Sequence, residues 1–225
     1  MNKIIRILVA ILLAMATAAI CVLISCNVQP TGKSVDLGLP SGTLWADRNV
    51  GAALPEDYGD YFAWGETKPK SNYSWATFKY CEDNSGDRFS KYNTQSKYGN
   101  VDNKTTLEKS DDAATANWGS DWCMPTQQQF QELKDNCTWI WTTRNGKNGY
   151  EVKGKNGNSL FFPAAGYRYG TVLYLAGSDG SYWSSSLYSD DPYGGRYLGF
   201  DSGSVDPDNW YYRGSGFSVR PVRCI

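Results

Sequence analysis

The sequence predicts an α+β domain with one main helix and several short antiparallel strands. A capped amphipathic helix is expected at residues 127–136. After it, β-branched and aromatic runs alternate with Asn-Gly dipeptides, a pattern typical of short strands joined by hairpin turns. The order along the chain is strand, strand, helix and then several strands, which is the order of an α+β domain.

The chain begins with the pattern of a secretory signal peptide. Lys3 and Arg6 precede an apolar run over residues 7–24, and this run ends in Leu23-Ile24-Ser25 directly before Cys26. A cysteine at that place resembles the lipobox of bacterial lipoproteins, in which the cysteine is acylated and becomes the first mature residue. We therefore expect lipidation at Cys26 and a lipid-anchored protein of the outer membrane or cell surface.

A short transmembrane anchor is the alternative, because the uncharged run is near the minimum length for spanning a bilayer. Asn27 follows the cysteine, where an aspartate would favour retention in the inner membrane. The expected organisation is a lipoprotein signal peptide at 1–25, a lipidated tether at 26–34 and a single domain at 35–225.

Two strand regions are expected before the helix, at residues 44–50 and in the aromatic stretch 59–65. Residues 66–110 are polar with scattered Tyr and Trp. So long a connection usually packs through its own aromatic side chains or carries function. A second, short helix is expected over residues 109–118.

The main helix has a clear start signal. Thr126 is a candidate N-cap, and Gln129 three residues later completes a capping box. Phe130, Leu133 and Cys137 then recur at helical spacing and predict one apolar stripe.

The chain after the helix is expected to be all β. Residues 138–143 form a β-branched and aromatic run. The dipeptides Asn145-Gly146, Asn148-Gly149 and Asn156-Gly157 predict hairpin turns, because Asn and Gly tolerate positive φ. Further strands are expected at Val152, 160–162, 182–184, 197–200 and 216–220.

Composition excludes several function classes. The chain has 22 Lys and Arg against 23 Asp and Glu, and loss of Lys3 and Arg6 with the signal leaves 20 cations. A mildly acidic chain without a basic patch argues against nucleic acid as a partner. The absence of histidine removes the commonest general base and metal ligand. The 16 Tyr, 9 Trp and 8 Phe are an unusually heavy aromatic content.

Four cysteines remain after the signal and lipid positions: Cys81, Cys123, Cys137 and Cys224. An exported protein keeps disulfides, and four cysteines allow three pairings between which the sequence does not choose. Free buried cysteines are the alternative, since cysteine is among the most buried residue types. Zinc is disfavoured, because no two cysteines have C-x2-C spacing.

Seven ordered motifs over about residues 35–223 resemble one family, the Fibrobacter succinogenes major paralogous domain of Bacteroidetes surface lipoproteins. They are Val35–Gly42, Gly59–Thr67, Trp122–Thr126, Asn136–Trp139, Phe162–Arg168, Tyr182–Ser186 and Gly216–Val222.

The resemblance implies a C-type lectin-like fold for the domain at 35–225, and the function of the family is largely unknown. The chain departs from the family at Cys123, where arginine is usual, which suggests a local disulfide or a thiol. A related branch, the formylglycine-generating enzyme, uses two active-site cysteines near its carboxyl end. Only Cys224 lies in that region here, so that activity does not carry over.

The stretch 166–215 is the candidate binding surface. Tyr, Ser, Gly, Asn and Asp with an occasional Trp and Arg give rigid aromatic area and adaptable hydrogen bonds, as in antibody paratopes. Sugar-binding proteins use the same aromatic residues for stacking on pyranose rings. The alternative is that these are structural turns whose aromatics fill the core. The candidate ligand-binding residues are Tyr188, Tyr193, Tyr197, Trp210, Tyr211, Tyr212 and Arg213.

Five other residues of this region are expected in the core. Leu198, Phe200, Phe217 and Val219 lie at alternating strand positions, and Trp183 is the fifth. Tyr197 has the opposite parity to Leu198 and Phe200, and we expect it to point outward.

Neither a metal site nor catalysis is expected, and no cofactor is implied. Hard oxygen ligands for calcium are present, but the Glu-Pro-Asn, Gln-Pro-Asp and Trp-Asn-Asp signatures of lectins are missing. A Ser-His or Cys-His pair is impossible without histidine, and no pair of acids is distinguished by its surroundings. The acids and amide considered for calcium are Asp190, Asp191, Asp206, Asp208 and Asn209.

The sequence therefore predicts a non-catalytic surface lipoprotein that is bound to the membrane through its lipid and that binds a glycan or a protein. Two alternatives stay open. One is a structural or assembly component of the cell envelope. The other is a target of a diversity-generating retroelement, because adenine-rich codons yield the Asn, Asp, Ser, Tyr and Gly of the carboxyl-terminal region.

Overall fold

The computed structural model describes residues 31–224. The expected signal peptide, Cys26 and the first part of the tether lie outside these residues. No helix within 31–224 combines the length and the apolar character needed to cross a bilayer. Strand β1 already begins at Ser34, the last residue assigned to the tether, so regular structure starts one residue before the expected boundary.

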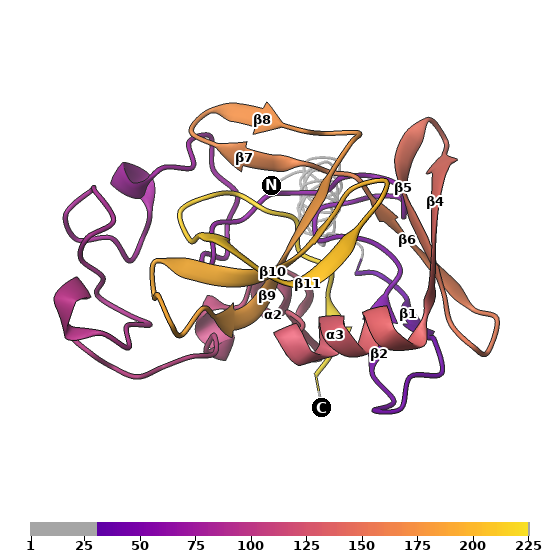
Figure 1. Ribbon diagram of the computed structural model, residues 1–225, viewed down its shortest axis with the longest axis horizontal. Coiled ribbons are helices and arrows are strands. Elements are labelled where there is room, and N and C mark those ends of the chain that lie inside the picture. Colours follow the sequence, from indigo (N-terminus) through magenta and orange to yellow (C-terminus); the bar gives the residue numbers. More distant parts are fainter. Residues whose placement is uncertain (1–30, 225) are drawn as a thin grey trace, which may run out of the picture. The chain divides into compact units, whose positions relative to one another are not determined.

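The described chain is mostly β, with two α-helices of which one is the main helix, and so has the mixed composition expected of an α+β domain (Figure 1). Its strands form small antiparallel sheets with the orders β1-β2-β12-β3, β11-β10-β9, β4-β5-β6 and β7-β8. The strands are β1 (Ser34–Asp36), β2 (Leu44–Ala46), β3 (Trp122–Cys123), β4 (Thr138–Arg144), β5 (Lys147–Lys153), β6 (Ser159–Pro163), β7 (Tyr167–Tyr169), β8 (Val172–Tyr174), β9 (Gly180–Leu187), β10 (Gly194–Phe200), β11 (Val205–Tyr212) and β12 (Val222–Arg223). The helices are α2 (Ala113–Trp118) and α3 (Gln127–Asn136), with short 3-10 turns at Trp75–Thr77, Ser96–Tyr98 and Lys109–Asp111.

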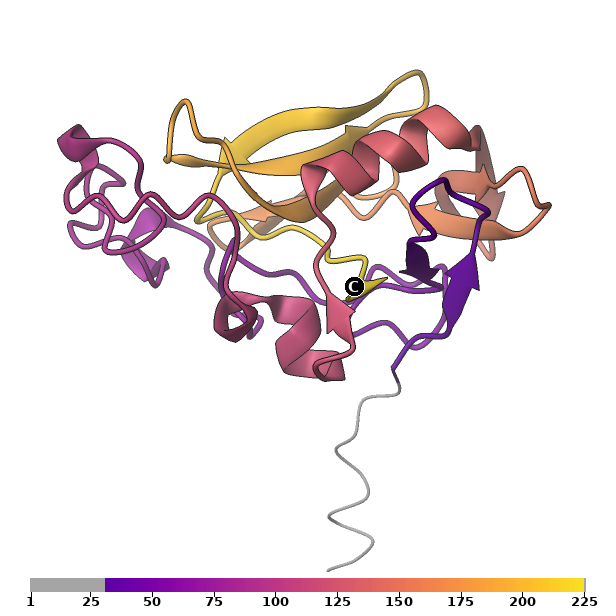
Figure 2. The ribbon, with the colours of Figure 1, turned by 90° about the horizontal axis from the view of Figure 1, so that it is seen from below.

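Helix α3 is the main helix, and its bounds match the prediction. The Thr126 hydroxyl accepts a hydrogen bond from the Gln129 amide at 3.2 Å, and the Gln129 side chain accepts one from the Thr126 amide at 2.9 Å. This capping box satisfies amides that the first helical turn leaves unpaired. Phe130 and Leu133 are fully buried, whereas Cys137 is the C-cap residue and only half-buried. The helix lies against the sheet β9-β10-β11 (Figure 2).

Two of the three expected hairpin turns are confirmed. Asn145-Gly146 joins β4 to β5, and Asn156-Gly157 lies between β5 and β6. The prediction for Asn148-Gly149 is wrong, because both residues lie inside β5. A Cβ atom on Gly149 would approach the Phe162 carbonyl oxygen to 2.2 Å, so glycine permits the close pairing of β5 with β6.

Two expected strands are not continuous strands. In 59–65 the regular pairing is limited to a bridge between Phe62 and Phe217, with mutual backbone hydrogen bonds of 2.9 and 3.0 Å. Residues 216–218 also pair only through isolated bridges, to three different parts of the chain. Both segments are buried like strands, but their backbone groups find partners one at a time. The first predicted strand region, 44–50, is strand only to Ala46.

The sheet β9-β10-β11, called the central sheet below, is packed on both faces. One face carries Tyr182, Leu198 and Phe200, which pack with Phe130 and Leu133 of α3. The other face carries Trp183, whose ring stacks on Phe217 with centroids 4.0 Å apart. The core residues expected from the sequence, Trp183, Leu198, Phe200, Phe217 and Val219, are all buried.

The long connection 66–110 packs through its own aromatic side chains, which is the first of the two roles expected for it. Phe78, Phe89 and Tyr92 are buried, and the half-buried Trp75 packs edgewise on Phe78 with centroids 5.6 Å apart. The ring centroid of Tyr193, the residue before β10, lies 4.6 Å from that of Trp75. The loop is therefore joined to the central sheet by aromatic contacts.

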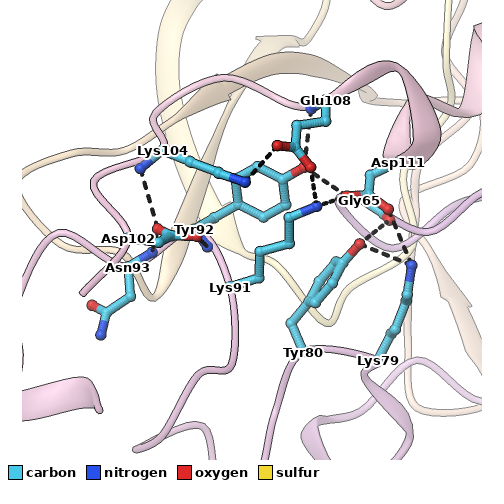
Figure 3. Close-up of polar contacts among 10 residues, drawn as sticks. All are labelled: Gly65, Lys79, Tyr80, Lys91, Tyr92, Asn93, Asp102, Lys104, Glu108 and Asp111. Carbon is cyan, nitrogen blue, oxygen red and sulfur yellow. Dashed lines mark hydrogen bonds and ion pairs between the residues drawn. The ribbon is translucent and has the colours of Figure 1, made fainter. Parts of the chain in front are cut away.

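A polar network also holds this loop (Figure 3). The buried Asp111 carboxylate accepts hydrogen bonds from Lys91 at 2.5 Å, Tyr92 at 2.7 Å and Lys79 at 3.1 Å. Burial alone would raise the pKa of this carboxyl, but bonds from Lys91 and its neighbours outweigh burial and hold the pKa well below the usual range. Lys91 also pairs with Glu108, which in turn accepts from Lys104 at 2.5 Å. The positive charges of Lys79, Lys91 and Lys104 thus compensate the negative charges of Asp111 and Glu108.

One disulfide joins Cys123 in β3 to Cys224 after β12. This bond belongs to one of the three pairings that the sequence left open, but the second bond of that pairing is not formed. Cys81 and Cys137 are free thiols within residues 31–224, as in the alternative of free cysteines. The bond spans 101 residues and fastens the carboxyl end of the described chain beside β3.

Candidate functional site

A pocket of about 350 Å³ opens on the Trp183 face of the central sheet, beside the hairpin β7-β8. Its aromatic side comes from Tyr197 in β10, Tyr211 in β11 and Tyr167 in β7. Pockets of this size are typical of small-ligand sites. Two residues expected to contact a ligand, Tyr197 and Tyr211, are therefore brought together here.

The aromatic side of the pocket is held by packing. Phe217 lies beneath it, with its ring centroid 4.9 Å from Tyr197, 5.6 Å from Tyr211 and 5.9 Å from Tyr167. The ring of Tyr167 also stacks on that of Tyr174 in β8, with centroids 5.5 Å apart. Since Phe217 itself stacks on the buried Trp183, the tyrosine rings have a rigid support.

A β-bulge in β11 determines which side chains reach the pocket. The register runs from Tyr197 opposite Asn209 to Gly199 opposite Asp206, so β11 has one residue more than β10 between these pairs. A bulge turns the following side chains to the other face of a sheet. Asp206 therefore lies on the pocket face with Asn209, while Asp208 lies on the opposite face.

The polar groups of the pocket include three carboxylates, a serine hydroxyl and a side-chain amide. Asp179, Asp201 and Asp206 line it. Ser181 as a whole is 93 % buried, but its hydroxyl is open to the pocket and makes no hydrogen bond within residues 31–224. The side-chain amide of Asn209 likewise has no partner within that range.

Burial raises the pKa of the Tyr197 hydroxyl to about 12, and the nearby Asp206, Tyr167 and Asp179 act in the same direction. Burial also raises the pKa of Tyr211, with Tyr167 as the next cause. Tyr197 and Tyr211 are therefore neutral hydrogen-bonding groups at physiological pH.

Three other candidates lie on the opposite face of the central sheet. Trp210 and Tyr212 are exposed by 40 % and 36 %. Trp210 stacks on Tyr188 with centroids 5.0 Å apart and planes 11° apart. The Arg196 guanidinium lies 4.6 Å from the Tyr188 ring and pairs with Asp208 at 2.5 Å. We call this group the Trp210 platform; a polar hollow of about 310 Å³ lies beside it.

The expectation of one loop surface is therefore wrong in two respects. Trp210, Tyr211 and Tyr212 lie in strand β11, where side chains alternate between faces. Tyr197 does point away from Leu198 and Phe200, but toward the core around Trp183 and Phe217 and toward the pocket instead of toward open solvent.

The prediction that Arg213 contacts a ligand is also wrong, because its side chain is fully buried and does not reach either surface. Its guanidinium lies 4.1 Å from the Phe89 ring, and Nη1 donates to the carbonyls of Lys91 and Tyr92 at 3.2 and 3.3 Å. Burial lowers the pKa of Arg213 to about 9, so it remains a cation at neutral pH. Arg213 anchors the loop 66–110 to the end of β11.

Sequence reasoning missed Tyr167, Asp179 and Ser181 as parts of the site. A parallel bridge between Gly166 and Gly180 brings them together beside β10. A Cβ atom on Gly166 would meet the Tyr174 carbonyl oxygen at 2.0 Å, and its φ is +63°. The glycine before Tyr167 was the available signal, because positive φ and close backbone approach both require glycine.

The residues considered for calcium are divided between the two faces. Asp206 and Asn209 line the pocket, whereas Asp208 lies on the platform side. Within residues 31–224, no group of three or more Asp, Glu, Cys or His side chains is placed to hold a metal ion.

Comparison with known proteins gives one family match. Residues 131–222 match a family described as Domain of unknown function (DUF8237). All residues that line the pocket fall inside this segment. No curated protein and no solved structure matches the chain.

Proposed function

We propose that the protein is a lipid-anchored surface protein whose lectin-like domain binds a saccharide without catalysis, in the pocket of the central sheet. The observation that carries this proposal is the pocket itself, which joins three tyrosine rings to polar groups that lack partners within the described chain. The lipobox pattern at Cys26 and the resemblance to the major paralogous domain support the anchor and the lectin-like fold.

The chemistry of the pocket suits a sugar. The apolar face of a pyranose ring packs against aromatic rings, and rigid tyrosines give this area at low entropic cost. Sugar hydroxyls donate to carboxylates, and the Ser181 hydroxyl and the Asn209 amide both donate and accept. Such a ligand would hydrogen-bond to pocket groups that no other part of residues 31–224 occupies.

The Trp210 platform is the less suitable surface. One face of its Tyr188 ring is covered by Trp210, and the guanidinium of Arg196 lies near the same ring. Its carboxylate, Asp208, is already paired with Arg196. Its polar groups therefore satisfy one another, in contrast to those of the pocket.

Removal of the Ser181 hydroxyl is expected to weaken saccharide binding without harming the fold. We expect Ser181→Ala to lower the affinity about 3- to 10-fold, the effect of one hydrogen bond to a ligand. The melting temperature should not fall, because the hydroxyl has no partner in the described chain. The measurement is capture of the full-length protein, purified in detergent micelles, on a glycan array, followed by titration with the captured glycan.

Trp210→Ala is the matched control, because it removes an aromatic ring from the opposite face of the same sheet. It should bind the captured glycan like the unaltered protein. Loss of binding in Trp210→Ala with full binding in Ser181→Ala would move the site to the platform. Capture of no glycan would contradict the proposed function.

The membrane anchor is expected to be an acylated Cys26, since Leu23-Ile24-Ser25-Cys26 resembles a lipobox. Mass spectrometry of protein extracted from membranes should show acyl mass on an amino-terminal Cys26. A mature start at another residue, or retention of residues 1–25, would contradict the lipid anchor.

A further inference from the structure

The pocket has a negative charge that the described chain does not neutralise. Asp179, Asp201 and Asp206 line it, and no Lys or Arg does. None of the three carboxylates forms an ion pair within residues 31–224. Like charges without a counterion in one concavity produce a negative potential that attracts cations.

Each carboxylate uses only one oxygen within the fold. Asp206 Oδ1 accepts from the Asp208 amide at 3.0 Å, and Asp179 Oδ2 accepts from Ser178 at 2.6 Å. Asp201 Oδ1 accepts from two amides of the following turn, at 2.7 and 2.9 Å. The second oxygen of each carboxylate has no hydrogen-bond partner in the described chain and is free for a ligand.

The aromatic rings add to the preference for a cation. A protonated amine is attracted to the face of an aromatic ring, and the pocket presents Tyr167, Tyr197 and Tyr211. Asp206 and Asp179 also raise the pKa of the Tyr197 hydroxyl, after burial as the main cause, so both carboxylates act on this ring.

The two faces of β11 differ in whether the chain itself supplies a cation to the carboxylate and the aromatic ring. On the platform face, Asp208 is paired with Arg196 at 2.5 Å, and Arg196 also lies over the ring of Tyr188. There the chain itself supplies the cation between a carboxylate and an aromatic ring. On the pocket face, Asp206 and Tyr211 have no such partner in the described chain.

We infer that the pocket prefers a saccharide with a free, protonated amine, such as the glucosamine units of a deacetylated glycan. The inference rests on the proposed function, because it assigns the ligand class of the same pocket. A lysine side chain would offer the same ammonium group. However, three tyrosine rings around a hollow of about 350 Å³ suit a sugar ring better than a narrow alkyl chain.

A pair of tetrasaccharides of equal length tests this inference. One is glucosamine tetramer, whose amines are free, and the other is N-acetylglucosamine tetramer, whose nitrogens are acylated and neutral. Calorimetric titration at pH 5, where the amines of the glucosamine units are protonated, uses the full-length protein in detergent micelles. We expect the glucosamine tetramer to bind about 10-fold more tightly at low ionic strength, with a smaller preference at 1 M salt.

Asp206→Asn should reduce this preference several-fold, because it removes one charge and keeps the oxygen that accepts from the Asp208 amide. Asp208→Asn is the matched control. It removes a carboxylate two residues further along the same strand, on the other face, and should leave the preference unchanged. Both carboxylates are exposed, so neither variant is expected to unfold the protein.

Equal binding of the two tetramers, or tighter binding of the acetylated one, would overturn the inference and leave the proposed function intact. An unchanged preference in Asp206→Asn would also overturn it. Tetralysine serves as the peptide probe, and binding tighter than that of the glucosamine tetramer would reject the sugar as the preferred ligand. Binding of neither tetramer rejects the inference, whereas failure of every glycan on the array rejects the proposed function as well.

Discussion

Trp183→Ala is expected to destabilise the domain by about 3–5 kcal/mol, the usual loss when a buried aromatic side chain becomes alanine. Trp183 is fully buried, its ring stacks on Phe217, and its indole nitrogen donates to the Phe62 carbonyl at 2.7 Å. For a domain of this size, such a loss lowers the melting temperature by roughly 6–20 °C. Thermal unfolding followed by circular dichroism measures it.

Trp210→Ala is again the comparison, since it removes the same side chain from an exposed position of the same sheet. It should cost no more than about 1 kcal/mol, because surface substitutions have small effects. Equal shifts of the melting temperature in the two variants would contradict the packing described here, in which Trp183 supports the pocket through Phe217.

Cys224→Ser is expected to destabilise the domain by about 2–5 kcal/mol, because it opens a disulfide between residues 101 positions apart. Most of this loss is attributed, in the chain-entropy account, to the greater freedom of the unfolded chain. The central position of β12 between β2 and β3 adds to the effect, since the disulfide holds the end of that strand. Urea unfolding of the oxidised protein gives the change in stability.

Cys137→Ser provides the control, because Cys137 is a free thiol at the end of α3. It should change the free energy of unfolding by less than about 1 kcal/mol. If Cys137→Ser proved as destabilising as Cys224→Ser, the pairing of Cys123 with Cys224 would be wrong.

The parts of the fold that depend on neighbouring residues could be predicted from the sequence. Thr126 and Gln129 determined the start of α3, and Asn145-Gly146 determined a hairpin turn, because both signals act within a few residues. The burial of Leu198 and Phe200 in the central sheet followed from alternation along β10. Asn148-Gly149 failed as a turn because the close approach of β6 decides the conformation of Gly149, and β6 lies outside any local window.

The candidate site depended on contacts that a sequence does not contain. The alternation along β10 correctly separated Tyr197 from Leu198, but it did not reveal that a second core and a pocket lie on that face. The bulge in β11 decided that Asp206 and Asp208 lie on opposite faces. Arg213 was predicted to contact a ligand because arginine among Tyr, Ser, Gly and Asp resembles the composition of an antibody paratope, while here the aromatic rings of Phe78 and Phe89 in the loop 66–110 enclose it.

The saccharide pocket is tested most directly by a crystal structure of the protein grown with the glycan that the array identifies. The expected result is a sugar ring against the tyrosines of the pocket, with its polar groups hydrogen-bonded to Ser181, Asn209 or Asp206. A sugar bound only at the Trp210 platform, with none in the pocket at saturating ligand, would contradict the proposed site.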